Sequence, residues 1–385
     1  MKSVRLLYVA LLIISIIGAN SSALASSNLS DELEKEKIYD HMRQAENKFK
    51  DLTSHIDPRI QDKNHIQKMT EILSLVDPSG RENVIFLDAD GSILSNKIEL
   101  IEEFKEQNAN LIDEKGKLKQ PITTKALTSL SDQGTGLLTS SNTSSWTGWK
   151  YPEAACPSVK TGPYRKVTTQ QGYSRMQATI KLPTKNQGII MTPTASSEDK
   201  GYVYMGATDK RNNQIDAGVA FNYGAGPYYW NEAWDMFIAG ADPGSSPGFG
   251  TFKPGWAVMK FYIPEDNKIV LEVTGTNKKN NELATFTVAA NVTGWLKDFN
   301  ANGSQVTLKR VTSIAQEKED LTTGSILGSS SDPVKWESVK IGTSTSNMIY
   351  PTIGYFCGYQ VSNVLVNFKD HSYEDVRIKT GTLSP

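Results

Sequence analysis

The sequence predicts a mainly β protein, with a two-sheet antiparallel sandwich in its C-terminal part and a small α+β, mostly helical unit before it. Residues 201–239 hold three runs in which apolar and polar residues alternate, as they do when successive side chains of a strand point to opposite faces of a sheet. In FYIPEDNKIVLEV (residues 261–273), Pro264–Asn267 joins two further alternating runs, which is typical of a β-hairpin. Strands at this density, without helical periodicity between them, favour two packed antiparallel sheets.

The helical unit is predicted from apolar residues that recur every three or four positions. Asp57-Pro58 interrupts the pattern, and Asp77-Pro78-Ser79-Gly80 ends the second helix. A third amphipathic run covers residues 97–108. The positions expected on the buried helix faces are Ile38, Met42, Ala45, Phe49 and Leu52, then Ile66, Met69, Leu73 and Val76, then Ile98, Ile101 and Phe104.

Two matching turns lie beside the third helix. In FLDADG (residues 86–91) and LIDEKG (residues 111–116), Asp stands three residues before Gly, as a type I turn prefers. We expect two short hairpins or strand–turn pieces that pack with the helices. Residues 126–145 are rich in Ser, Thr and Gly and form the predicted linker. The expected organisation is a signal peptide over 1–25, the α+β unit over 26–125, the linker over 126–145 and the sandwich over 146–385.

The sandwich strands follow from period-two patterns along the second half of the chain. Tyr202 and Tyr204 share one strand face. Further strands are predicted at 257–263, 268–274, 283–290, 305–311 and 360–368. The other residues that share a face within their strand are Met176, Ala178, Ile180 and Leu182, then Ile215, Ala217, Val219 and Phe221, then Trp234, Met236 and Ile238.

The N-terminus predicts export. Lys2 and Arg5 precede an apolar run over residues 6–19, and Ala23-Leu24-Ala25 has the small-residue pattern of a signal-peptidase site, with cleavage after Ala25. The apolar run is shorter than the ~20 residues of a membrane-spanning helix, and no later segment could span a bilayer. The formal net charge of −1 does not favour a nucleic-acid partner. We therefore expect a freely secreted, extracellular protein.

The chain has two cysteines, Cys156 and Cys357. In an exported protein an even number of cysteines favours a disulfide. Two buried free thiols are the alternative, because unpaired cysteine often behaves as a small apolar residue.

The strand patterns resemble the concanavalin-A-like lectin and glucanase sandwiches. The residues that carry this resemblance are IDAGVAFNYG (215–224), the hairpin FYIPEDNKIVLEVTGT (261–276) and VSNVLVNF (361–368). The resemblance covers roughly residues 146–370 and implies a jelly-roll, lectin-like sandwich. The whole chain also resembles the exported, functionally unassigned YrpD-type proteins of bacilli.

Four oxygen-bearing residues are candidate metal ligands. Asp88, Asp90, Ser92 and Glu99 occupy positions one, three, five and twelve of an EF-hand-like loop, with helical patterns on both sides. The sixth position should be Gly, but Ile93 stands there. The DADGS sequence also resembles the nucleophile motif of haloacid-dehalogenase-type phosphatases, although too few residues follow for their parallel sheet. We expect a structural hairpin without a cofactor, with calcium as the alternative.

Glu232 and Asp235 are the candidate catalytic carboxylates. Glycoside hydrolysis uses two carboxyl groups about 5 to 10 Å apart. Residues three apart in a strand point to opposite faces, so this pair could act together only across a bulge. The ExDxxE signature of the retaining glucanases on this fold is absent. If the protein is an enzyme, we expect a polysaccharide hydrolase or lyase whose other residues come from other strands.

Five aromatic residues are candidate ligand-binding rings: Tyr228, Tyr229, Trp230, Trp234 and Trp256. They lie in or beside Gly/Pro-rich stretches, where flat rings can stack on sugar faces while Asn, Asp and Glu accept hydroxyl hydrogen bonds. The alternative is a core position, which the shared strand face of Trp234, Met236 and Ile238 favours.

Three functions are consistent with these patterns. The first is binding of a glycan or cell-envelope polysaccharide, and the second is cleavage of such a polysaccharide on the same sandwich. The third is a non-catalytic interaction role in the cell envelope. The sequence makes no prediction of oligomeric state.

Overall fold

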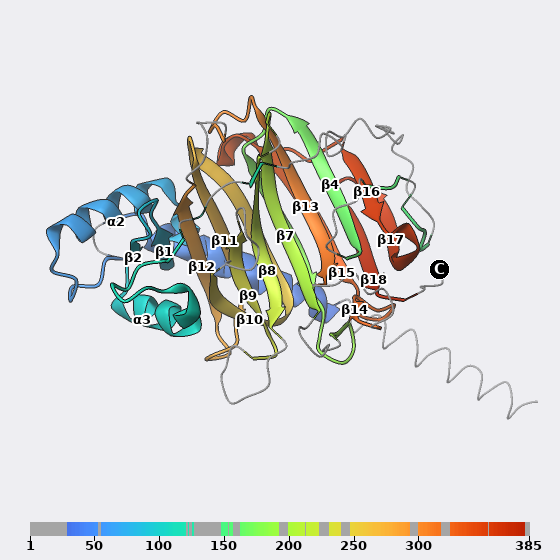
Figure 1. The fold of residues 1–385 in the computed structure, drawn as a ribbon, viewed down its shortest axis with the longest axis horizontal. Helices are drawn as coiled ribbons and strands as arrows, with labels where there is room; N and C mark the ends of the chain where they lie inside the picture. The colour runs from blue at the N-terminus through green and yellow to red at the C-terminus, as the bar shows by residue number, and fades with distance from the viewer. Residues whose placement is uncertain are drawn as a thin grey trace, which may run out of the picture.

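The computed structural model describes residues 29–52, 55–120, 122, 148–152, 154–156, 162–191, 199–211, 213–222, 231–239, 247–292, 299–316, 324–352 and 354–381, and the backbone of residues 125–126. The predicted fold class is confirmed: the protein is a mainly β sandwich with a small helical part at its N-terminal end (Figure 1). The predicted signal peptide lies outside the described residues, as does the predicted linker except for residue 126. Within the described part of the chain, no helix is long and apolar enough to cross a membrane.

The first layer, which we call sheet I, contains nine strands. They are antiparallel except for β1, which pairs in parallel with β12. In spatial order, sheet I consists of β2 (Ile93–Ser95), β1 (Asn83–Leu87), β12 (Leu283–Asn291), β11 (Lys268–Asn277), β10 (Gly248–Glu265), β5 (Arg175–Leu182), β15 (Val334–Gly342), β18 (Tyr373–Lys379) and β17 (Val364–Asp370).

The second layer, sheet II, is antiparallel throughout. Its order is β9 (Ala233–Ala239), β8 (Asn213–Asn222), β7 (Lys200–Asp209), β13 (Val306–Ala315), β4 (Tyr164–Gln171) and β16 (Tyr355–Tyr359). The short strand β3 (Lys125–Ala126) pairs with β8. The short strands β6 (Ile189–Ile190) and β14 (Ile326–Leu327) continue from β18.

The long strand β10 connects the two layers. Its first residues, Gly248 to Phe252, pair with β9 of sheet II, and residues 255–262 pair with β5 of sheet I. A register shift between Phe252 and Ala257 separates these two parts, and Gly255, the first residue of the second part, has a φ of +132°, which favours glycine. The bend therefore lets one strand belong to both sheets.

The core lies between the two sheets, and the alternation patterns predicted it correctly. The predicted apolar faces of β5, β8 and β9 all belong to one buried cluster. Phe249, Phe252 and Phe261 of β10 complete it. Tyr202 and Tyr204 of β7 are only partly buried and point to the opposite side, the outer face of sheet II.

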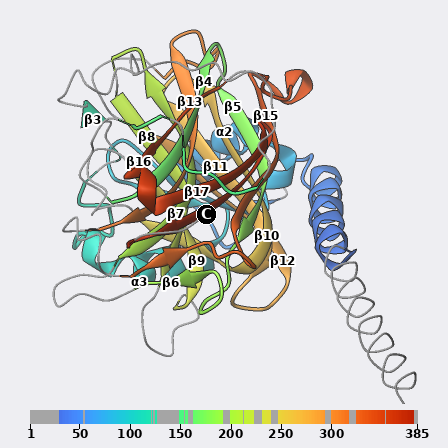
Figure 2. The same cartoon turned by 90° about the vertical axis from the view of Figure 1, so that its right-hand side faces the viewer.

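The N-terminal helices cover sheet I. The helix over residues 29–48 lies along its outer face, as Figure 2 shows, with Ile38 and Met42 packed on Trp256 and Val258. The second helix, α2 (Lys63–Leu75), begins at Asp62, whose carboxylate accepts hydrogen bonds from backbone N–H groups of its first turn. Its residues Met69, Ile72 and Leu73 pack on the outward side chains of β1, β10, β11 and β12.

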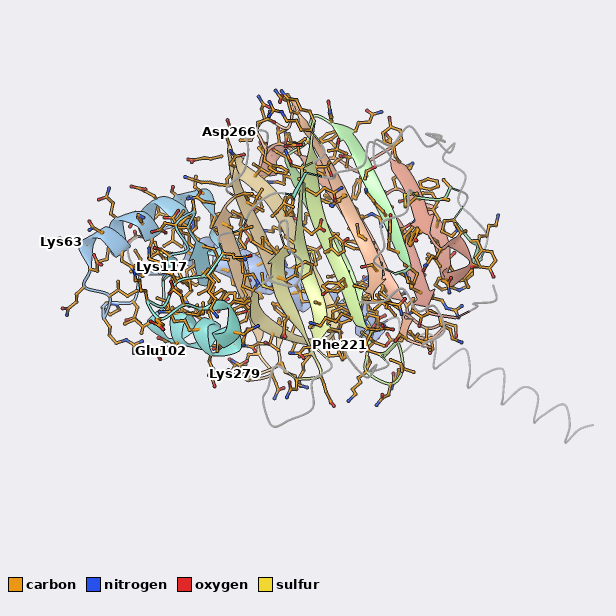
Figure 3. The ribbon with its side chains drawn as sticks, in the orientation of Figure 1. Lys63, Glu102, Lys117, Phe221, Asp266 and Lys279 are labelled. Atoms are coloured by element: carbon orange, nitrogen blue, oxygen red, sulfur yellow. A yellow bond between two sulfur atoms is a disulfide. The ribbon has the colours of Figure 1, made fainter. Side chains whose placement is uncertain are left out.

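The third helix, α3 (Ile98–Gln107), lies at one end of the sandwich. Its residues Leu100 and Phe104 belong to the main core, where Phe104 contacts Phe249 at 6.2 Å between ring centroids. Figure 3 shows Lys63, Glu102 and Lys117 of this N-terminal part at the same end of the molecule. Because β1 also extends sheet I, the helical unit and the sandwich share one sheet and one core.

The predicted disulfide is confirmed. Cys156 and Cys357 are bonded, with their Cα atoms 4.9 Å apart. The bridge lies on the outer face of sheet II beside Tyr164 and Val311.

Candidate functional site

The outer face of sheet II carries the candidate site. Across β7, β8 and β9 the register places Tyr202 beside Ala220 and Asp235, and Tyr204 beside Gly218 and Phe237. Asp216 lies two residues before Gly218 on β8, on the same face of the sheet. We call Tyr202, Tyr204, Asp216, Asp235 and Phe237 the outer-face site.

Three aromatic rings form the centre of the outer-face site. Phe237 contacts Tyr202 and Tyr204 edge-on, at 5.3 and 5.9 Å between ring centroids. This contact spans β8 because the residue between them is Gly218. A Cβ at Gly218 would lie 2.4 Å from the Cα and Cβ of Tyr204. Glycine therefore lets Tyr204 lie across a neighbouring strand.

Asp235 lies at one border of the site, and its carboxyl group is incompletely paired. Asn222 donates a hydrogen bond of 3.2 Å to Oδ2, and Thr251 stands opposite on β10. Oδ1 is buried and accepts no hydrogen bond from the described residues. Burial raises the pKa of Asp235 to about 7, against the opposing effects of Thr251 and Asn222. At neutral pH this group is therefore poised between the acid and the carboxylate, which is unusual for an aspartate.

Asp216 lies at the opposite border and forms an ion pair. Its Oδ1 is 2.6 Å from Nζ of Lys309, a buried lysine of β13. Burial raises the pKa of the Tyr204 hydroxyl well above its usual value, and the negative charge of Asp216 adds to this effect. The site thus combines a partly neutral carboxyl group, aromatic rings and an ion-paired carboxylate along one face.

The structure does not bring Glu232 and Asp235 together. Glu232 precedes β9 in a left-handed turn, with a φ of +58°, and forms an ion pair with Lys185. Its side chain is 47% exposed, whereas the Asp235 carboxyl lies on the sheet face. Asp216 is also distant from Asp235. Asp235 pairs with Ala220, which is four residues from Asp216 on β8, so the Cα atoms of the two aspartates are roughly 14 Å apart.

Two of the five candidate rings, Trp234 and Trp256, are described by the structure, and both are buried. Tyr228, Tyr229 and Trp230 lie outside the described residues. Trp234 is fully buried between the sheets, where its ring contacts Phe221 and its Nε1 donates to the carbonyl oxygen of Pro183 at 3.2 Å. Trp234 therefore occupies a core position, which was the alternative prediction for this ring.

Trp256 is buried as well, at 2% exposed, between sheet I and the helix over residues 29–48. The Nζ atom of Lys35 lies 4.5 Å from its ring centre. The expectation that the rings of Trp234 and Trp256 face solvent is wrong, because each ring fills an apolar interface inside the protein.

Three of the four candidate metal ligands, Asp88, Asp90 and Ser92, lie in the hairpin turn between β1 and β2, whereas Glu99 lies in α3. Gly91, with a φ of +79°, donates its N–H to the carbonyl oxygen of Asp88. Each carboxylate has a cation beside it: Lys68 at 3.0 Å from Asp88, Lys117 at 2.7 Å from Asp90, and Arg59 at 2.5 Å from Glu99. Within the described ranges, no group of three or more His, Cys, Asp or Glu residues is placed to hold a metal ion. Ser92 accordingly contributes its backbone N–H to Asp90 as a turn residue.

Sequence reasoning missed most of the outer-face site, although the signal was present. Side chains alternate along β8, so that Ile215, Ala217 and Val219 point inward. Asp216 and Gly218 therefore point outward. A strand whose outward residues are acidic or very small leaves room for rings from its neighbours. That pattern, together with Tyr202 and Tyr204 on the preceding strand, could have identified this face.

Comparisons with known proteins find no family. No family model matches the chain, and no curated protein matches it. The predicted resemblance to YrpD-type proteins therefore stays a prediction.

Among solved structures, a scytalido-glutamic peptidase bound to a peptide-based transition-state analogue is 11% identical over 57% of this chain and 98% of its own, with a TM-score of 0.35. The catalytic domain of an endo-1,3-β-glucanase (laminarinase) from Thermotoga petrophila is 9% identical over 56% of this chain and 77% of its own, with a TM-score of 0.21. A non-specific endo-β-1,3(4)-glucanase from family GH16 is 10% identical over 58% of this chain and 60% of its own, with a TM-score of 0.17.

Proposed function

We propose that this protein is a secreted polysaccharide-binding protein, and that the glycan binds on the outer-face site. The observation that carries the proposal is Asp235, a carboxyl group at the border of an aromatic patch whose Oδ1 lacks a partner among the described residues. A sugar hydroxyl would donate to Oδ1, while the rings of Tyr202 and Tyr204 offer apolar contact.

Two further observations support this proposal. The ion pair of Asp216 with Lys309 forms a second polar border on the same face, so that hydroxyl groups at the two ends of a short oligosaccharide would find partners. The Cys156–Cys357 disulfide fits an oxidising compartment outside the cell, as does the signal-peptide pattern.

The test is retention on insoluble polysaccharides followed by titration with the oligosaccharide that is bound. Tyr204→Ala should weaken binding about fivefold, because one ring contact contributes roughly 1 kcal/mol. Tyr350→Ala is the control, since Tyr350 is an exposed tyrosine that belongs to no part of the outer-face site. If no polysaccharide is retained, or if both variants bind alike, the proposal fails.

A second candidate function is polysaccharide cleavage with Asp235 as general acid. The pKa of about 7 favours it, because a carboxyl group that keeps its proton near neutral pH can donate that proton to a leaving oxygen. Asp235→Asn should abolish turnover of the retained polysaccharide and leave its binding within a few fold. Unchanged turnover in that variant, or none in the wild-type protein, would leave binding as the function.

A further inference from the structure

A second cluster of charged residues lies between the two sheets, away from the outer-face site. Arg165 of β4 and Arg310 of β13 both reach Glu374 of β18. The Arg165 Nη2 atom donates to Oε2 of Glu374 at 2.8 Å, and Arg310 Nη1 donates to Oε1. All three side chains are at most 2% exposed. Two cations and one anion are therefore removed from water together.

The charges in this cluster do not balance. Asp370 also acts on Arg310, but it is the exposed last residue of β17, where its carboxylate accepts hydrogen bonds from Ser372. Aromatic rings offset part of the excess, since the Arg165 guanidinium lies 4.7 Å from the Phe356 ring centre. A buried charge that is not fully compensated still costs several kcal/mol. Burial accordingly lowers the pKa of Arg310, against the effect of Glu374.

Several buried nitrogen atoms in and beside this cluster lack hydrogen-bond partners among the described residues. Among the described residues, Arg310 Nη2, Arg165 Nη1 and His371 Nδ1 have no hydrogen-bond partner, although all three atoms are buried. Buried donors are almost always paired, with protein or with a bound species. His371 lies beside the cluster, with its ring 5.5 Å from that of Phe368.

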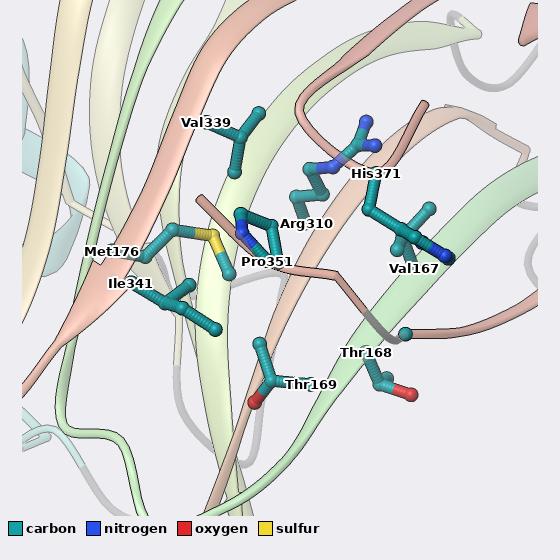
Figure 4. Close-up of a pocket in the computed structure, with 10 residues that line it drawn as sticks. Val167, Thr168, Thr169, Met176, Arg310, Val339, Ile341, Pro351 and His371 are labelled. Carbon is teal, nitrogen blue, oxygen red and sulfur yellow. The ribbon is translucent and has the colours of Figure 1, made fainter. Parts of the chain in front are cut away.

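A small cavity connects two of these residues. Arg310 and His371 both line it, and its space accommodates about one water-sized particle. Figure 4 shows Met176 and Ile341 on one side of the cavity, His371 and Val167 on the other, and Arg310 between them. The rest of the lining is mostly apolar, apart from Thr168 and Thr169.

We propose that this cavity is a binding site for a monatomic anion, such as chloride, held by Arg310 and the Nδ1–H of His371. One negative charge would neutralise the excess of the cluster, and a halide accepts from both donors at once. The size of the cavity selects against phosphate, sulfate and carboxylate ligands. Burial and the charge of Arg310 lower the pKa of His371, so its ring is neutral, and we place its single N–H proton on Nδ1.

The test is thermal unfolding of the full-length mature protein in sodium chloride, sodium bromide and sodium gluconate at equal ionic strength. A ligand that binds only the native state stabilises it in proportion to the logarithm of its concentration. We expect the melting temperature to rise by roughly 2 °C for each tenfold increase in halide, and not to rise in gluconate. Crystals soaked in bromide should show an anomalous peak between Arg310 and His371.

Two variants and one control make the test specific. Arg310→Met leaves one guanidinium with one carboxylate, so the halide dependence should vanish whatever the absolute melting temperature. His371→Phe keeps the excess charge but removes a donor, and should reduce the dependence. Lys369→Ala removes an exposed lysine two residues from His371 and should behave as the wild type. Equal melting in all three salts, or an unchanged halide dependence in Arg310→Met, would overturn the proposal.

Discussion

At the scale of the residue, Asp235 is the most unusual group of the outer-face site. A carboxyl group whose pKa is raised on folding binds its proton more tightly in the native than in the unfolded chain. Its favourable contribution is complete below the unfolded pKa of about 4 and is lost as the pH rises through about 7.

We therefore expect Asp235 to make the protein less stable as the pH rises from 4 to 7. The Asp235→Asn variant, which cannot ionise, should lose this dependence, so the wild-type-minus-variant difference in unfolding free energy should fall by up to about 1.4 kcal/mol per pH unit in that window. Denaturant unfolding at a series of pH values measures it. A difference that stays flat from pH 4 to 8 would show that the carboxyl ionises normally.

At the scale of the element, a buried ion cluster fixes the turn after α2 to sheet I. Asp77 precedes the short helix η2 (Pro78–Gly80) and receives two hydrogen bonds from Arg175 of β5, at 2.6 and 2.9 Å. Lys260 of β10 lies 3.4 Å from Asp77 and 3.0 Å from Glu272 of β11. Burial raises the pKa of Glu272, whereas Lys260 and Arg175 outweigh burial at Asp77 and lower its pKa. Two cations and two carboxyl groups thus join the helical part to three strands.

Removing one member of this cluster should detach that contact. Asp77→Ala leaves Arg175 and Lys260 without one of their acceptors, and we expect a loss of about 3 kcal/mol in unfolding free energy. Asp40→Ala, which breaks the exposed pair with Arg43, should cost less than about 1 kcal/mol. Chemical unfolding of both variants makes the comparison, and equal effects would mean that the cluster does not stabilise the fold.

At the scale of the whole molecule, the disulfide closes a long loop. Cys156 and Cys357 are 201 residues apart, and their bond joins the segment before β4 to β16 at the edge of sheet II. Restricting so long a loop in the unfolded chain stabilises the native state by roughly 5 kcal/mol at most.

We expect the double variant Cys156→Ala/Cys357→Ala to melt several degrees below the wild type, because the unfolded chain regains that freedom. Reductant should lower the melting temperature of the wild type and leave that of the double variant unchanged. A wild-type protein that melts identically with and without reductant would contradict this expectation.

The sequence by itself determined most of the strands and helices and most of their buried faces, although Leu100 and not Ile98 or Ile101 is buried with Phe104 on α3. These features are local: side-chain direction alternates with each residue of a strand, so the inward positions of Ile215 to Phe221 follow without knowledge of any neighbour. The Asp88–Gly91 turn was predicted from an equally local pattern, an Asp three residues before a Gly.

Only the tertiary structure decided which faces are covered and which residues meet. Trp256 is buried because a helix from more than 200 residues earlier in the chain packs on it, and Asp235 has its raised pKa because β8 and β10 surround it. Arg165, Arg310 and Glu374 come from strands of opposite layers. Strand order and layer packing depend on contacts between distant segments, and no pattern within a single strand specifies them.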